Sequence, residues 1–258
     1  MRKSIFITGA ASGIGRETAR LFAGKGWFVG IVDIDSDGLH SLQAELGEEN
    51  CCLATADVGD MESLGAALEV FSTLTGGKMN VLFNNAGILR MGRNDTISLE
   101  DQLLTVDVNV KGVLNSIHFA LPLLKQTQGA RIISMCSASS IYGMPELAVY
   151  SATKHAVRAL TEAFDLEFER YGIRSCDIIT PYVATPMVTG ASQQAYSVTS
   201  TGVNLGPGQI AALVWKAAHG HKLHWKIHPM TYLLFFTFWA LPFLKRPIIK
   251  HLCLSKGN

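Results

Sequence analysis

The sequence predicts one α/β domain in which a doubly wound parallel sheet of about seven strands is flanked by helices. Short apolar runs alternate with longer helical stretches along residues 1–228. Several runs are continuously apolar, as in parallel strands buried on both faces. Neither an internal repeat nor a linker divides the 258 residues. Right-handed crossovers between parallel strands then place the helices on both faces of the sheet.

Each element follows from this alternation, taken in chain order. The expected strands are 4–8, 28–33, 51–55, 80–84, 131–136, 174–180 and 223–227. The expected helices are 14–25, 36–47, 60–75, 99–125, 149–171 and 207–219. Residues 186–206 are rich in Ser, Thr, Gly and Gln, which predicts a mobile loop. Residues 229–258 form an apolar and basic extension of the same single domain.

Composition narrows the functional classes. A formal net charge of +1 gives no general electrostatic reason to bind nucleic acid. The five cysteines have no zinc-site or disulfide spacing, which favours a reduced, cytoplasmic setting. Four histidines within residues 219–228 could suggest a metal, but strand alternation already explains two of them, so no metal site is predicted.

A glycine-rich turn follows the first expected strand and opens the first helix, in the sequence Thr-Gly-Ala-Ala-Ser-Gly-Ile-Gly over residues 8–15. Glycines at such a turn let the backbone approach a pyrophosphate at the helix N-terminus. The alternative is a tight turn without a ligand, since the spacing is not the usual Gly-x-Gly-x-x-Gly. The expected cofactor contacts here are Gly9, Ser12, Gly13, Ile14 and Gly15.

Acidic and small residues end the next strands. Asp33 stands where a carboxylate would bind the adenosine ribose hydroxyls and repel a 2′-phosphate. No Arg or Lys occupies 10–14 or 34–37, so the sequence favours NAD over NADP. Further cofactor contacts are expected after the third and fourth strands, at Asp57, Val58, Asn84, Ala86 and Gly87. Each of these residues could instead simply turn the chain.

Tyr150 and Lys154 lie four residues apart and would share one helix face. A fixed cation beside a phenol favours the phenolate and lowers its pKa, so the pair could perform acid–base chemistry. Alone the pattern is weak, because it also occurs on solvated helices.

Together with Asn109 and Ser137, these motifs resemble the classical short-chain dehydrogenase/reductase family over residues 4 to about 228, with its Rossmann-type fold. The resemblance implies that Tyr150 is the catalytic acid–base and that Lys154 lowers its pKa and binds the nicotinamide ribose. It also implies that Ser137 orients the substrate oxygen and that Asn109 holds a water for proton relay. Family members usually form dimers or tetramers through helices corresponding to 99–125 and 149–171.

One motif departs from the family pattern, because Tyr182 replaces a glycine after Pro181. Tyrosine would be strained if that backbone needed a positive φ. Pro181, Val183 and Thr185 are still expected to meet the cofactor, with Tyr182 in the substrate pocket. The other expected pocket residues are Ser139 and Met187.

The segment 229–254 combines an apolar run of about fifteen residues with Lys245, Arg246 and Lys250. This run is shorter than the ~20 residues of a spanning helix, and Pro242 interrupts it. Contact with a membrane interface and a cover over the pocket or a neighbouring subunit are both open. Either suggests a hydrophobic substrate, a secondary alcohol or ketone of steroid, retinoid or other lipid-like type. The alternative functions are a non-catalytic NAD-binding protein and a peripheral membrane interaction protein.

Overall fold

The computed structural model describes residues 2–254, in which seven parallel strands form one sheet. Their spatial order is β3-β2-β1-β4-β5-β6-β7, so the strand order reverses between β1 and β4. A crevice for a ligand is expected at the carboxyl ends beside such a reversal. The strands are Ser4–Thr8, Phe28–Asp33, Cys51–Thr55, Val81–Asn84, Arg131–Met135, Arg174–Ile179 and His224–Lys226, numbered β1 to β7. The predicted strands and doubly wound topology are therefore confirmed, with ends shifted by at most one residue.

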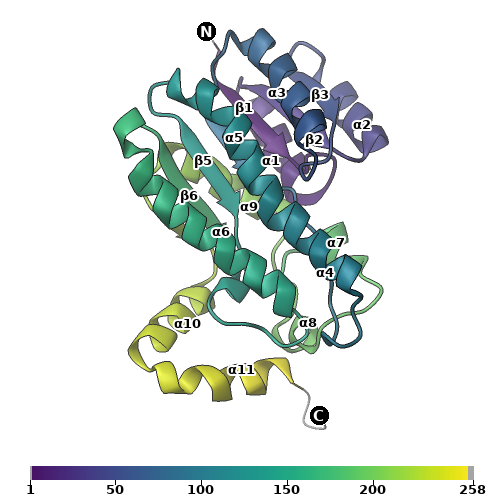
Figure 1. The fold of residues 1–258 in the computed structure, drawn as a ribbon, viewed down its shortest axis with the longest axis vertical. Helices are drawn as coiled ribbons and strands as arrows, with labels where there is room; N and C mark the ends of the chain where they lie inside the picture. The colour runs from purple at the N-terminus through teal and green to yellow at the C-terminus, as the bar shows by residue number, and fades with distance from the viewer. Residues whose placement is uncertain (1, 255–258) are drawn as a thin grey trace.

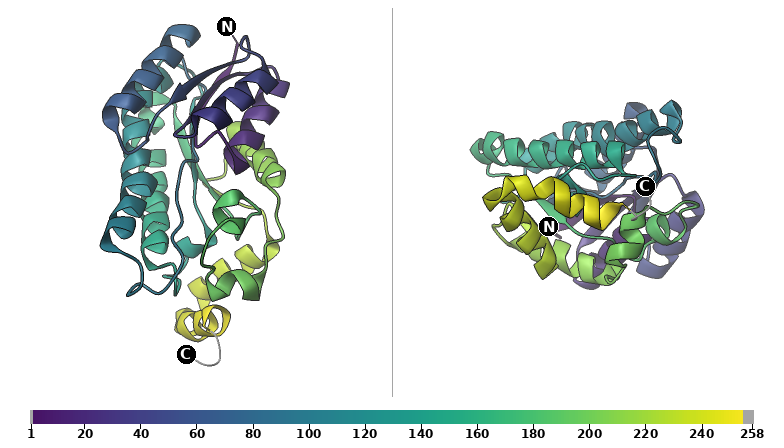
Figure 2. Two further views of the ribbon diagram at one scale, coloured as in Figure 1. Left: turned by 90° about the vertical axis from the view of Figure 1, so that its right-hand side faces the viewer. Right: turned by 90° about the horizontal axis from the view of Figure 1, so that it is seen from below.

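Helices cover both faces of the sheet because side chains of each strand alternate between two cores. Ile5 and Ile7 of β1 pack into one core and Phe6 into the other. The first core is closed by α1 (Gly13–Gly24), α2 (Ser36–Leu46) and α9 (Pro207–His219). The second is closed by α3 (Met61–Thr75), α5 (Gly112–Lys125) and α6 (Ala148–Glu167). Figures 1 and 2 show the two helical layers with the sheet between them.

The single helix expected over 99–125 is interrupted. It consists of α4 (Leu99–Val106), a π-helical turn η1 (Asp107–Lys111) and then α5. Ser98 begins α4 by accepting a hydrogen bond from the backbone N–H of Asp101. The wider π-turn carries Asn109, and such turns often occur at functional sites. The helix expected over 149–171 ends as α6 at Glu167 and is followed by a short 3-10 turn, Glu169–Tyr171.

Residues 186–206 contain two short helices, which differs from the predicted loop. These are α7 (Pro186–Thr189) and α8 (Tyr196–Thr201). Val188, Ala195 and Val198 are buried in a small apolar cluster with Leu147. Packing between residues far apart in sequence therefore orders a stretch whose composition indicates only turns.

The C-terminal segment forms two helices joined by a short 3-10 turn. They are α10 (Pro229–Ala240), η4 (Pro242–Leu244) and α11 (Lys245–Cys253). The pair bends by 117° between Thr231–Ala240 and Pro242–Cys253, and within residues 2–254 no one helix is long and apolar enough to cross a membrane. Figure 1 shows α10 and α11 in yellow at one end of the molecule, with α11 beside α8.

Candidate active site

A cavity of about 1110 Å³ lies at the carboxyl ends of the strands. Its walls come from the turns that follow β1 to β6 and from the C-terminal helices. The cavity is lined by residues from both parts of the predicted site. Gly9 and Asp33 belong to the predicted nucleotide contacts, and Ser137, Tyr150 and Lys154 to the predicted catalytic group. One continuous space therefore connects the expected nucleotide contacts with the expected acid–base group.

The glycine-rich turn leaves room for a ligand at Gly9 and Gly13, which have φ angles of 68° and 52°. A Cβ at Gly9 would lie 2.8 Å from the Cα of Ala86, so only glycine fits that left-handed position. Both glycines line the cavity together with Ser12 and Ile14. Gly15 does not line the cavity, and its contact with a cofactor stays a prediction. A Cβ there would lie 2.0 Å from the carbonyl oxygen of Gly9, so the absence of a side chain at Gly15 allows the first turn of α1 to pack against that oxygen.

Asp33 lines the cavity, and the backbone orients its carboxylate. Its Oδ2 accepts from the N–H of Ala11 at 2.9 Å, and its Oδ1 accepts from the N–H of Asp35 at 3.2 Å. The carboxylate is thus fixed between the glycine-rich turn and the start of α2, the place expected for a ribose-binding group.

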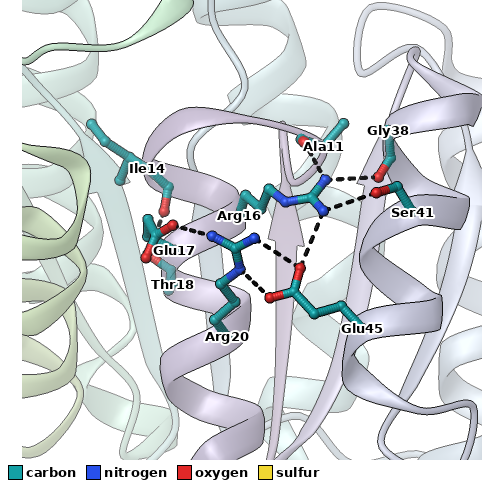
Figure 3. Close-up of polar contacts among 9 residues, drawn as sticks. All are labelled: Ala11, Ile14, Arg16, Glu17, Thr18, Arg20, Gly38, Ser41 and Glu45. Carbon is teal, nitrogen blue, oxygen red and sulfur yellow. Dashed lines mark hydrogen bonds and ion pairs between the residues drawn. The ribbon is translucent and has the colours of Figure 1, made fainter.

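Arg16 reaches the same turn from α1, outside the residue windows considered for a 2′-phosphate. It donates to the carbonyl oxygens of Ala11 and Gly38, each at 3.2 Å, and pairs with Glu45 at 3.2 Å (Figure 3). Arg20 also binds Glu45, and these hydrogen bonds hold the pKa of that carboxyl below its ordinary value. The guanidinium of Arg16 is therefore engaged by carbonyls and a carboxylate, and it does not line the cavity.

Asp57 and Val58, two of the residues expected to contact the cofactor, line the cavity after β3. Asp57 Oδ1 accepts from the N–H of Gly59 at 2.8 Å, which shapes the turn. The carbonyl oxygen of Val58 accepts from Asn115 Nδ2 at 2.9 Å. The side chain of Asp57 is thereby held at the cavity wall.

Neighbouring asparagines after β4 have different roles. Asn84 is buried, donates to Ser134 Oγ at 3.3 Å and does not line the cavity, so its cofactor contact stays a prediction that the cavity lining does not support. Asn85 does line it and donates to the carbonyl oxygens of Thr8 and Gly9 at 3.0 and 2.9 Å. Sequence reasoning missed Asn85. The available signal was that Asn84 is still within the strand, whereas Asn85 begins the turn.

Tyr150 and Lys154 lie on one face of α6, and both line the cavity. Lys154 Nζ is 5.5 Å from the centre of the Tyr150 ring and donates to the carbonyl oxygen of Met135 at 2.9 Å. Burial raises the pKa of the Tyr150 phenol, while a hydrogen bond with Ser137 opposes the rise. Burial also lowers the pKa of the Lys154 ammonium. The effect on Tyr150 is therefore opposite in direction to the lowering expected from Lys154, because both charged forms lose hydration here.

Asn109 is buried and bonded to the turn after β4. Its Oδ1 accepts from the N–H of Ile88 at 2.8 Å, and its Nδ2 donates to the Ile88 carbonyl oxygen at 2.9 Å. Nδ2 also donates to Thr153 Oγ1 at 3.2 Å, and Thr153 donates to the carbonyl oxygen of Tyr150 at 2.7 Å. Thr153, which sequence reasoning missed, thus connects Asn109 to α6, the helix of Tyr150 and Lys154.

Gly87 lies close to both Asn109 and Lys154. A Cβ on Gly87 would lie 3.1 Å from Asn109 Oδ1 and 3.8 Å from Lys154 Nζ. Gly87 and Ala86 both line the cavity, as predicted. Lys154 lines the same cavity, whereas Asn109 is buried behind Gly87 and does not line it.

The turn after β6 tolerates Tyr182 without strain. Within residues 2–254, Glu146 is the only non-glycine residue with a positive φ. Pro181, Tyr182, Val183 and Thr185 all line the cavity, and Tyr182 shares a 2.7 Å hydrogen bond with Ser197 of α8. Tyrosine therefore ties the turn to the 186–206 segment, which a glycine could not do.

Ser139 and Met187 also line the cavity, as expected for the substrate pocket. The Ser139 hydroxyl is buried and makes no hydrogen bond within residues 2–254, so it is a polar group available to a ligand. The C-terminal helices add an apolar wall that sequence reasoning left open. The wall residues are Thr231, Leu234, Phe238, Ile249 and Leu252.

One of the four histidines in residues 219–228, His224, lies beside two carboxylates. His224 Nδ1 lies 3.0 Å from the buried Asp177, and its Nε2 lies 3.3 Å from Glu162. Across residues 2–254, no three His, Cys, Asp or Glu side chains gather as metal ligands.

Comparison with known proteins adds a family match. Residues 3–195 match the family model described as short chain dehydrogenase. Oxidoreductase UcpA of Salmonella typhimurium is 36% identical over 196 residues, which are 75% of this chain and 74% of that protein. Cyclohexanol dehydrogenase of an Acinetobacter species is 33% identical over 189 residues, 72% of this chain and 75% of that protein.

A solved structure gives a similar result. The 3-ketoacyl-(acyl-carrier-protein) reductase of Brucella melitensis, complexed with NADH, superposes with a TM-score of 0.79 at 28% identity. The superposition covers 87% of this chain and 96% of that one.

Proposed function

The chain belongs to the short-chain dehydrogenase family and is an oxidoreductase acting on CH–OH groups, and we propose that it uses NAD(H) to interconvert a hydrophobic secondary alcohol and its ketone. The observation that carries the proposal is that one cavity is lined both by Asp33, the expected ribose-binding residue, and by Ser137, Tyr150 and Lys154, the expected catalytic residues. The NADH complex of the Brucella reductase supports the choice of cofactor.

The residues present fit a dinucleotide. The glycines at 9 and 13 line the cavity at the N-terminus of α1 and form the cradle proposed for the pyrophosphate. A Cβ at Gly9 would clash with the backbone of Ala86, so the turn can pack this closely only with glycine there. Asp33 offers a carboxylate for ribose hydroxyls, which disfavours a 2′-phosphate by charge repulsion. When bound, NAD(H) accepts or supplies the hydride. We assign Val183 and Thr185 to the nicotinamide end of the cradle.

Tyr150 is the proton donor and acceptor at the substrate oxygen in this proposal. Because burial raises its pKa, the phenol is protonated at neutral pH and ready to protonate a ketone oxygen. In the oxidative direction the phenolate must form first, so oxidation is favoured by higher pH. Ser137 lowers the cost of that phenolate through its hydrogen bond and orients the substrate oxygen.

Lys154 and Asn109 complete the proposed proton route. Gly87 lines the cavity beside Lys154 and close to Asn109, and the proposed water would bind there. A water there would pass a proton from the region of Lys154 toward solvent, while Asn109 fixes the turn at Ile88. Lys154 would also bind the nicotinamide ribose.

A hydrophobic substrate is supported by the wall of the cavity. Leu234, Phe238 and Ile249 line it from the C-terminal helices and Met144 from the loop before α6. Apolar walls with a few polar groups are typical of sites that bind apolar molecules. Steroid, retinoid and other lipid-like secondary alcohols or ketones are the candidates.

The enzyme is also proposed to be a homodimer or homotetramer in the cytoplasm. Leu99 and Leu103 of α4 and Leu166 of α6 are large apolar side chains that are exposed in the single chain. Their contact with the same helices of a second copy would remove them from water. We further propose peripheral membrane contact through residues 229–254.

Activity with a panel of hydrophobic secondary alcohols and ketones tests the proposal, with NAD(H) absorbance as the readout. Tyr150→Phe should abolish turnover while NADH still binds, as measured by cofactor fluorescence. Turnover that survives this substitution would overturn the assignment of Tyr150. NADH binding with no turnover of any panel member by the unaltered protein would favour a non-catalytic NAD-binding role.

A further inference from the structure

The C-terminal helices have two different faces, and the first is a wall of the cavity. Residues 229–254, here called the C-terminal clasp, place Leu234, Phe238 and Ile249 against the cavity. Phe238 is only 3% exposed, and these residues pack with Ile141 and Met144 beside the catalytic helix. Ser200 of α8 donates to the carbonyl oxygen of Leu252 at 2.6 Å, which attaches the end of α11. The clasp therefore packs against the rest of the protein and forms part of the cavity wall.

The second face is strongly apolar and points away from the protein. Trp239 is 80% exposed, Phe243 71% and Phe236 63%. Tyr232 and Leu233 are also exposed, so large side chains continue along α10. Nothing within residues 2–254 covers this face, and so large an exposed aromatic group marks an interaction surface.

Charge indicates the kind of partner. Lys245, Arg246 and Lys250 follow the aromatic residues on α11, and Arg246 and Lys250 are exposed. Residues 178–258 contain no Asp or Glu. Two copies meeting through this face would place positive charge against positive charge with no carboxylate of the clasp to compensate. Aromatic side chains beside basic ones instead complement an anionic lipid surface.

Shape supports contact in the plane of a bilayer. The 117° bend at Pro242 divides the clasp into two short helices, each too short to span the hydrocarbon core. Both lie together at one end of the molecule, clear of the two helical layers (Figures 1 and 2). The clasp that carries the exposed aromatic residues is thus at an end of the molecule.

We propose that the C-terminal clasp docks on an anionic lipid bilayer and that its inner face receives the substrate from the lipid. The claim that the clasp docks on lipid depends only on the clasp, whereas the claim that it receives substrate from the lipid rests on the proposed function. The substrate class follows from the two faces: a membrane-dissolved molecule with an apolar body and one secondary hydroxyl or ketone. Its apolar body would lie against Leu234 and Phe238, with the oxygen near Ser137 and Tyr150.

Vesicle binding by the full chain tests the docking half without any activity measurement. Vesicles of phosphatidylglycerol with phosphatidylcholine should bind the protein. Vesicles of phosphatidylcholine alone should bind it with an affinity at least about tenfold lower. Replacing Trp239 and Phe243 together by Ser should weaken binding about tenfold or more, because two exposed aromatics no longer insert. Replacing Lys245 and Arg246 together by Gln should abolish the preference for phosphatidylglycerol. Leu74→Ser on α3 is the matched control, an exposed apolar residue far from the clasp, and should leave binding unchanged.

The outcomes separate the two proposals. No vesicle binding, or equal binding by the aromatic double variant, overturns the docking proposal. Loss of a dimer in that variant, seen by sedimentation without vesicle binding by the unaltered protein, would assign the face to a second copy and also overturn it.

Activity tests the second half. With a secondary alcohol dissolved in vesicles, the aromatic variant should lose turnover about tenfold, whereas turnover of a water-soluble secondary alcohol should not change. Equal loss for both substrates overturns uptake from lipid. Vesicle binding without turnover of any alcohol would leave docking in place and remove the proposed function.

Discussion

Ser137→Ala separates two roles that one hydroxyl could have at Tyr150. The Ser137 hydroxyl forms a hydrogen bond with the tyrosine that lowers its pKa against the larger effect of burial. A hydrogen bond to a charged group contributes about 1.5–3 kcal/mol, and one pKa unit corresponds to about 1.4 kcal/mol. Removing the hydroxyl should therefore raise the pKa of Tyr150 by about 1–2 units.

The assay is the pH dependence of kcat/KM for oxidation of a secondary alcohol, which reports groups of the free enzyme. Oxidation needs the phenolate, so its rate rises as pH approaches the tyrosine pKa. A raised pKa moves this limb to higher pH, and below the limb the variant should be about 10–100-fold slower. The difference should shrink as pH increases.

Ser139→Ala is the matched control, since Ser139 lies in the same short turn but its hydroxyl has no hydrogen bond within residues 2–254. Its pH limb should stay in place. If Ser137→Ala lowers kcat/KM equally at every pH, Ser137 only orients the substrate and does not set the tyrosine pKa, and the reasoning fails.

Three further substitutions test the cofactor end and its support. Asp33→Ser combined with Ile34→Arg should raise the ratio of kcat/KM for NADP over NAD about tenfold or more, and an unchanged ratio would remove Asp33 from the ribose site. Asn109→Ala leaves the backbone N–H and carbonyl of Ile88 unpaired, so thermal unfolding should show a loss of about 3 kcal/mol and a Tm lower by roughly 6–12 °C. A fall below about 2 °C would contradict this bonding. Gly9→Val should weaken NADH binding in a fluorescence titration and lower the Tm, because its φ of 68° and the backbone facing it exclude a branched side chain; unchanged binding would argue against the cradle.

Much of the fold could be predicted because its signals are local. Most strands of the sheet are largely apolar runs bounded by polar or glycine residues, and the glycine-rich turn occurs directly between β1 and α1. Tyr150, Lys154 and Ser137 reach one cavity because the carboxyl ends of parallel strands meet at one edge.

The parts that could not be predicted depend on distant contacts. Asn84 and Asn85 are chemically identical, and only the position where β4 ends sends one toward Ser134 and the other toward Gly9. Composition alone does not order residues 186–206, whose helix α8 is fixed through Tyr182 and Ser197. The wall formed by Phe238 and Ile249 depends on a sharp bend near Pro242, whose angle no periodicity reveals.

The π-turn at Asp107–Lys111 also has a consequence for how this chain tolerates insertion and deletion. A π-turn accommodates one residue more than an α-helical turn, so α4 and α5 can each keep their faces while the backbone between them widens. Deleting Val110 would let the stretch close into one regular helix without unpacking its ends. The loss would fall on Asn109, which would rotate away from Ile88. Such a single-residue deletion would therefore remove the Asn109–Ile88 hydrogen bonds, with a loss of stability like that expected for Asn109→Ala, while α4 and α5 keep their packing. It would also remove Asn109 from the proposed proton route.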